Sequence, residues 1–368
     1  MPTAAEPVVL VASSEFILKS SPVRRTLEQR LIDDLKFALR RENLDCSRVE
    51  KEAARFVVFG PRQTDLATAI CRNVFGVAYA AAAVLLTNPT LDDIIETVVE
   101  FARRKISAGK SFAIRAHRST PTALSRHDVE VKGGSMVLSA LKDRGVRVDL
   151  GDPDVTLHVD LVGSDAYVYS HKLVGPGGLP LSAQWKMLAV LDSGPLSVLA
   201  ALAMMRRGCV VEFFVPVSNT MAHLFAESQL ALARRVSRLV TRPNYKAFVL
   251  EIDELFKERH ATIAERRLLR AVAIKFALEN RFKGIIFGDV SGHLSSLGGY
   301  AGLSSLPIFY PLLALEQEDL SDLWRLAGLE SRELSLEDGC EGGFILSEAE
   351  MRPLLDEFPL SSVREVQL

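Results

Sequence analysis

The chain has 368 residues, more than one ordinary domain needs, so two or three compact units are expected. Its 48% hydrophobic and 24% charged residues are typical of a folded globular protein and exclude a disordered or fibrous one. Four scattered cysteines without a C-x-x-C pair argue against a disulfide framework and a structural zinc site. No apolar run reaches the roughly 18 residues that cross a bilayer, and no signal peptide is evident, so we expect a cytoplasmic protein without a membrane partner.

The formal net charge of −2 hides an uneven distribution of charge along the chain. Residues 101–150 hold eleven Lys and Arg against four acidic residues, whereas residues 301–368 hold four Arg against 14 acidic residues. This asymmetry favours contact between the middle of the chain and a polyanion. The simpler explanation of the same basic residues is a helix face exposed to solvent. The basic side chains expected to reach nucleic-acid phosphates are Lys110, Arg115, His117, Arg118, Arg126 and Lys132.

Two short α/β patterns come first in the chain. Apolar strands predicted at 8–12 and 55–59 alternate with helices predicted at 26–40 and 65–75, which indicates a small unit of the split-βαβ type. The second pattern starts at residue 91 with a helix that Thr90 can cap. Its predicted elements are that helix, a half-buried strand, a second helix and two further strands, at 91–106, 111–117, 128–143, 155–161 and 166–169.

A Gly-Pro-Gly-Gly-Leu-Pro segment at 175–180 is the clearest boundary, because it combines turn residues with no periodic apolar pattern. Behind it come an apolar strand at 187–191, an apolar helix at 196–207 and a buried strand at 210–215. Such continuous apolar strands are typical of a parallel sheet covered on both faces. A later helix and a strand at 284–287 extend the pattern, so the back half is predicted to be a doubly wound α/β domain.

Two turns in this back half follow apolar strands, at 192–197 and 288–296. Ligands of open parallel sheets bind beyond the carboxyl ends of the strands, where helix N-termini point free N–H groups outward. Both turns are therefore candidate phosphate-binding loops. Taken alone, each also fits an ordinary strand-to-helix connection.

Several motifs run in order through nearly the whole chain. They are Glu15 and Lys19 in a Glu-x-x-x-Lys segment, the Val-Asp-Leu…Pro-Asp stretch 148–154, the Gly/Pro segment 175–180, the loop 191–197, the basic pair Arg266-Arg267 and the turn 288–296. In content and order these motifs resemble the 4-thiouridine synthetase (tRNA sulfurtransferase) family. The resemblance implies a ferredoxin-like α+β domain at 1–75 and a THUMP RNA-binding α/β domain at 76–172. A linker at 173–185 and a PP-loop (nucleotide-alpha-hydrolase-like) domain at 186–368 would follow, without a rhodanese domain.

The resemblance also implies a function. The front half would bind the 3′ end of tRNA and present uridine 8 to the back domain, where ATP adenylates the uracil C4 oxygen and a persulfide sulfur displaces AMP. Cys340 stands at the family's catalytic cysteine position. The implied nucleotide-binding residues are Val190, Leu191, Asp192, Ser193, Gly194, Ser197, Val215, Pro216, Arg266 and Gly288.

Several positions depart from the family's pattern. The family's Ser-Gly-Gly-x-Asp-Ser loop has an aspartate that organises Mg²⁺ and pyrophosphate, but this chain has Leu196, which can neither coordinate a cation nor accept a hydrogen bond. Thr262 and Glu265 replace a C-x-x-C pair of many archaeal relatives, so no iron–sulfur cluster is expected. Leu297 and Gln317 stand where the family has a glutamine and a lysine.

Three functions fit this sequence. The first is an ATP-dependent sulfurtransferase that makes 4-thiouridine in tRNA with an unusual loop, and the second is a non-catalytic tRNA-binding protein that works with an active partner subunit. The third is nucleotide sensing without adenylation. A sulfur-donor protein and a second copy of the chain are further partners compatible with the sequence.

Overall fold

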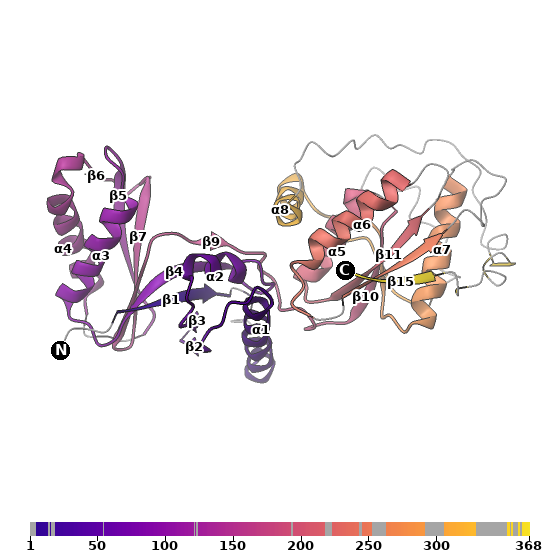
Figure 1. The fold of residues 1–368 in the computed structure, drawn as a ribbon, viewed down its shortest axis with the longest axis horizontal. Helices are drawn as coiled ribbons and strands as arrows, with labels where there is room; N and C mark the ends of the chain where they lie inside the picture. Colours follow the sequence, from indigo (N-terminus) through magenta and orange to yellow (C-terminus); the bar gives the residue numbers. More distant parts are fainter. Residues whose placement is uncertain are drawn as a thin grey trace. The chain divides into compact units, whose positions relative to one another are not determined.

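A computed structural model describes residues 5–13, 15, 19–53, 55–120, 122, 124–192, 194–217, 223–242, 245–251, 263–290, 305–328, 352–353, 355, 360 and 363–368. The chain forms two compact units, Met1–Gly178 and Leu179–Leu368 (Figure 1). Within the described residues, no helix is both long and apolar enough to cross a membrane.

One mixed sheet runs through the first unit. Its strands are β1 (Ala5–Ala12), β2 (Arg48–Glu52), β3 (Arg55–Phe59), β4 (Tyr79–Leu86), β5 (Ser111–Arg118), β6 (Arg147–Val148), β7 (Val155–Val162), β8 (Asp165–Tyr169) and β9 (Leu173–Val174). They lie in the order β2-β3-β1-β4-β8-β7-β5-β6, and β9 pairs with β4. The helices of the unit are α1 (Ser21–Arg41), α2 (Thr64–Cys71), α3 (Leu91–Lys105) and α4 (Arg126–Ala140).

Strand β4 lies where the two predicted front domains meet. It pairs with β1 along its whole length, from Leu86 opposite Ala5 to Tyr79 opposite Ala12, and its other edge pairs with β8. The predicted ferredoxin-like and THUMP parts therefore share one continuous sheet.

Helices α3 and α4 cover one face of this sheet. Thr90 caps α3 as expected: its hydroxyl accepts a bond from the Asp93 N–H at 3.2 Å, while the Asp93 carboxylate accepts one from the Thr90 N–H at 2.8 Å. The apolar stripe of α3, with Ile94 and Val98, packs with α4 onto β5, β7 and β8. This core of the first unit therefore lies between two helices and strands β4, β5, β7 and β8.

The predicted linker 173–185 is packed rather than extended. Leu173 and Val174 form β9, and the next residue, Gly175, donates its N–H to the Ala78 carbonyl at 2.9 Å. A Cβ at Gly175 would overlap the carbonyl oxygens of Val77 and Arg72, so the first glycine of the Gly/Pro segment is required by close backbone approach.

The second unit contains a six-stranded sheet. Its strands are β10 (Lys186–Val190), β11 (Val210–Val217), β12 (Lys246–Glu251), β13 (Ile285–Ile286), β14 (Ile308–Phe309) and β15 (Val363–Gln367), and its helices are α5 (Pro195–Arg206), α6 (His223–Ser237), α7 (Ile263–Glu279) and α8 (Gln317–Ala327). The order is β14-β13-β10-β11-β12-β15, with every pair parallel except β12 and β15.

This sheet winds in two directions from β10. The chain passes through α5 and α6 to β11 and β12 on one side, and then through α7 to β13 and β14 on the other. Helix α7 and helices α5 and α6 lie on opposite faces (Figure 1), and Leu188 and Val190 of β10 pack against α7. The predicted doubly wound parallel domain is confirmed, and its topological switch point lies between β10 and β13.

Some elements were not predicted from the sequence. Strand β4 is rich in alanine and β2 reads Arg-Val-Glu-Lys-Glu, and neither composition favours a strand. Both become strands because β1 and β3 offer them partners. The helix predicted at 65–75 ends at Cys71, and the strand predicted at 284–287 shortens to two residues.

A group of polar side chains lies on the sheet face opposite α3 and α4. The Arg55 guanidinium of β3 is 3.1 Å from the Asp160 carboxylate of β7, although three strands separate them in the sheet, so the sheet curls strongly. His158 stacks on Tyr169 with ring centroids 4.9 Å apart. Burial, and secondarily the positive charge of Lys172, lowers the pKa of His158 to about 4.

We predict that this histidine makes the first unit sensitive to acid. Because its pKa falls from 6.5 to about 4 on folding, stability is full above pH 6.5 and is lost as the pH falls toward 4. An NMR titration of the imidazole and urea unfolding of His158→Gln, which should flatten this dependence, measure the effect. His127→Gln, at an exposed position of α4, is the control, and an imidazole that titrates near 6.5 would contradict the prediction.

Candidate functional site

The loop that joins β10 to α5 lies at the carboxyl edge of the second sheet. Leu191 still pairs with β11, because its N–H donates to the Phe214 carbonyl at 2.9 Å. Gly194 then adopts φ 58° and ψ −143°, a backbone conformation that suits glycine, and is the N-cap residue of α5. The first turn of α5 therefore directs its N–H groups toward this edge.

Gly288, directly after β13 and Phe287, packs against the start of α5. A Cβ at Gly288 would lie 2.6 Å from the Ser197 nitrogen and 2.7 Å from its Cα. Only glycine allows this approach. The two turns singled out in the sequence are thus in contact at the switch point, which is where open parallel sheets bind ligands.

A buried arginine joins the same two loops. Arg270 of α7 donates from Nε to the Asp192 Oδ2 at 2.6 Å and from Nη2 to the Asp289 Oδ1 at 3.1 Å, and its Nη1 is 2.9 Å from the Asp289 Oδ2. The exposed fractions of the Arg270, Asp192 and Asp289 side chains are only 1%, 2% and 0%. Sequence reasoning missed this arrangement, although an arginine within the apolar run Leu-Leu-Arg-Ala-Val-Ala of α7 was its signal, since a buried charge needs a partner.

The other predicted nucleotide-binding residues lie around this point. Val190 ends β10 and Leu191 follows it, and Val215 and Pro216 lie near the end of the neighbouring β11; all four are buried. Arg266 belongs to α7, but its side chain lies outside the described residues.

Two predicted site residues, Ser193 and Cys340, lie wholly outside the described residues. Of the described cysteines, Cys46, Cys71 and Cys209 are free, and burial raises the pKa of each thiol, for Cys209 to about 11. At neutral pH these thiols are protonated and poorly nucleophilic.

The residues described at this edge do not fit a Mg²⁺ site. Asp192 and Asp289 are the carboxylates at hand, and both already bind the Arg270 guanidinium. Leu196, at the place of the family's aspartate, is buried in the first turn of α5 and offers no oxygen. No group of three His, Cys, Asp or Glu side chains that could hold a metal occurs in the described part of the chain.

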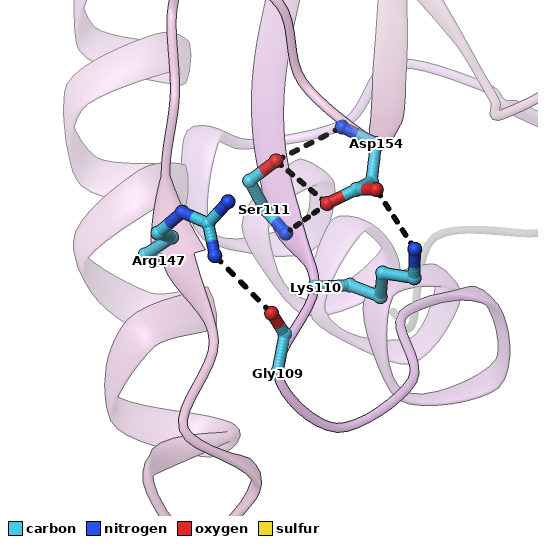
Figure 2. A network of polar contacts seen from close by, with 5 residues as sticks. All are labelled: Gly109, Lys110, Ser111, Arg147 and Asp154. Carbon is cyan, nitrogen blue, oxygen red and sulfur yellow. Dashed lines mark hydrogen bonds and ion pairs between the residues drawn. The ribbon is translucent and has the colours of Figure 1, made fainter.

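On the first unit, Lys110 is held within its own domain. Its Nζ is 2.9 Å from the Asp154 carboxylate, which also accepts bonds from the Ser111 N–H at 2.8 Å and the Ser111 hydroxyl at 2.9 Å (Figure 2). The hydrogen bonds from Ser111 and Lys110 keep the pKa of Asp154 well below its usual range. The last aspartate of the Val-Asp-Leu…Pro-Asp stretch therefore fixes the start of β5.

The remaining predicted RNA-binding side chains are more available. Arg115 donates to the Leu150 carbonyl, whereas His117, Arg118, Arg126 and Lys132 lie at exposed positions. Lys110 and Arg118 stand at opposite ends of β5, roughly 25 Å apart for eight extended residues. These two basic residues are thus too far apart to contact the same phosphate.

We predict that Gly288→Ala destabilises the second unit by roughly 1–3 kcal/mol, because the new methyl group overlaps the α5 backbone. Urea unfolding measures this change in stability. Gly134→Ala in α4 is the matched control, since no atom lies within 4 Å of its added Cβ, and it should stabilise by about 0.5–1 kcal/mol. Equal stability of Gly288→Ala and the unaltered chain would contradict the close approach of the two turns.

Comparisons with known proteins agree with this architecture. Residues 88–171 match the family model of the THUMP domain, and residues 182–353 match that of the Thiamine biosynthesis protein (ThiI). A probable tRNA sulfurtransferase of Halobacterium salinarum is 30% identical over 380 residues, covering 99% of this chain and 93% of the relative. One from Methanosarcina mazei is 29% identical over 343 residues, covering 87% of this chain and 82% of the relative.

Two solved structures share the fold. The crystal structure of a 4-thiouridine synthetase–RNA complex with bound ATP superposes with a TM-score of 0.74 at 16% identity, covering 98% of this chain and 99% of that one. PH1313 from Pyrococcus horikoshii superposes with a TM-score of 0.65 at 22% identity, covering 88% of this chain and 100% of that one. With a THUMP unit, a ThiI unit and a full-length relative at 30% identity, the chain belongs to the tRNA sulfurtransferase (4-thiouridine synthetase) family.

Proposed function

We propose that this chain binds tRNA with its first unit and an adenine nucleotide with its second, and that it converts uridine 8 of tRNA to 4-thiouridine. The observation that carries the proposal is the contact of two glycine-bearing turns at the switch point between β10 and β13. Membership of the tRNA sulfurtransferase family supports the substrate. The related structure that holds RNA and ATP supports both ligands.

The nucleotide site has an apolar side and a polar side. Val190, Leu191 and Val215 lie at or near the carboxyl ends of two neighbouring strands, and their apolar side chains suit an adenine ring. Gly194 and Ser197 lie in the first turn of α5, where N–H groups and the positive end of the helix dipole favour a phosphate. Such a phosphate site needs no acidic side chain in the loop.

The reaction requires two steps, because the uracil C4 oxygen is a poor leaving group. Attack of that oxygen on the α-phosphate of ATP releases pyrophosphate and turns the oxygen into part of a phosphate ester. A persulfide sulfur can then add at C4 while AMP leaves with the oxygen. An external thiol cleaves the remaining S–S bond, forming a disulfide with the inner sulfur and releasing 4-thiouridine. Cys340 is the thiol that we assign to sulfur transfer, with a sulfur-donor protein to recharge it.

A second candidate function is favoured by the chemistry of the loop. Since Leu196 offers no ligand and Arg270 binds both nearby carboxylates, the described residues lack the acidic group that would organise metal-bound pyrophosphate. In that case the chain is a non-catalytic tRNA-binding protein that works with an active partner subunit. It would bind the nucleotide without turning it over.

One experiment separates these two functions. The full-length chain is incubated with unmodified tRNA, ATP, Mg²⁺ and a persulfide donor, and AMP release and the absorbance of 4-thiouridine are followed. We expect both products, and we expect Cys340→Ser to make no 4-thiouridine while it retains tRNA binding. Tight tRNA binding without any AMP would overturn the enzymatic reaction and support the second function.

The RNA surface has its own test. We predict that Arg118→Glu and Lys132→Glu each weaken tRNA binding and flatten its salt dependence by about one unit for each phosphate that is no longer bound. Filter binding at several salt concentrations measures this slope. Lys246→Glu, on the second unit in an ion pair with Glu365, is the matched control. If both variants keep the full slope, the tRNA lies on another surface.

A further inference from the structure

Arg270 is inaccessible to any ligand, yet it contacts both loops of the nucleotide site. It is fully buried, and it emerges from a stretch of α7 in which Leu268, Leu269 and Ala271 are also buried. Its fork joins Asp192, the first residue after Leu191, to Asp289, the residue after Gly288. A group placed in this way cannot act on the nucleotide directly.

A buried ion pair is a poor source of net stability, because the cost of removing charges from water offsets their attraction. What a guanidinium supplies is geometry, since its planar fork binds carboxylates at fixed angles and distances. Arg270 binds two carboxylates from two different loops, at 2.6 Å to Asp192 and 2.9 Å to Asp289. Neither loop can shift without breaking one of these ion pairs.

We propose that Arg270 is a positioning residue: by holding Asp192 and Asp289 together from α7, it places the α5 N-terminus and Gly288 around one nucleotide phosphate. This role rests on the proposed nucleotide site and goes beyond it, because a residue without ligand contact then sets the geometry of both loops that bind the phosphate. The ligand class is the phosphate chain of an adenine nucleotide.

The test is a double-mutant cycle with ATP as the titrated ligand. Calorimetry on the full-length chain compares Arg270→Lys, Asp192→Asn and the double variant, because lysine keeps the charge but lacks the fork. We expect Arg270→Lys to weaken ATP binding about tenfold, and the double variant to bind no more weakly than Arg270→Lys, because both changes break the same contact. Lys246→Met, which breaks the exposed ion pair with Glu365 in the same unit, is the control and should bind ATP normally.

Asp192→Asn is the second variant, and it removes one charge while the Arg270–Asp289 pair persists. Hydrogen exchange at the first turn of α5 should rise in this variant, and ATP binding should weaken. The positioning role alone is overturned if the losses of ATP affinity in the two single variants multiply in the double variant. It is also overturned if Arg270→Lys and Asp192→Asn both bind ATP with unchanged affinity. If the unaltered chain fails to bind ATP, the proposed nucleotide site itself is overturned, and the positioning role with it.

Discussion

The second unit is organised around one buried guanidinium. Arg270 reaches from α7 to carboxylates that follow β10 and β13, so the strands on both sides of the switch point end at a shared cation. Charges buried this deeply are tolerated only when they are paired. Gly288 adds a steric constraint one residue away, because it packs against the Ser197 backbone. The carboxyl edge is thus held by an ionic contact and a close backbone contact together.

Binding and turnover make different demands on this edge. A phosphate can be held by the N–H groups at the start of α5, and this requires only the backbone geometry that Gly194 and Gly288 permit. Release of metal-bound pyrophosphate requires free acidic oxygens, and here Asp192 and Asp289 are bound to Arg270 while Leu196 has none to offer. Among the described residues, this edge therefore has the backbone for binding a phosphate but no free carboxylate for a metal ion.

In the first unit, contacts between residues distant in sequence decide the role of several side chains and strands. Its basic residues suggest a polyanion surface, but Lys110 is paired with Asp154 and Arg115 with the Leu150 carbonyl, so part of this charge serves the fold. Strand β4 likewise has little intrinsic preference for a strand and exists because β1 and β8 flank it. Exposed side chains such as Arg118 remain available to a nucleic acid.

The sequence by itself determined the class of the back domain and the place of its two turns. Continuous apolar strands followed by a glycine-bearing turn and an apolar helix have few solutions other than a covered parallel sheet. The sequence also located the capped start of α3 at Thr90, because a cap depends on neighbouring residues alone. These features are local, so composition and spacing were sufficient to predict them.

Only the tertiary structure decided which charges meet. Arg270 lies 78 residues from Asp192 and 19 from Asp289, and their contact depends on β10 and β13 being neighbours in the sheet. Lys110 and Asp154 are likewise 44 residues apart and meet because β5 and β7 are paired. Strand order arises from long-range pairing, which no local pattern encodes. For that reason the sequence could indicate a nucleotide edge, while the partners of its acidic residues became known only from the fold.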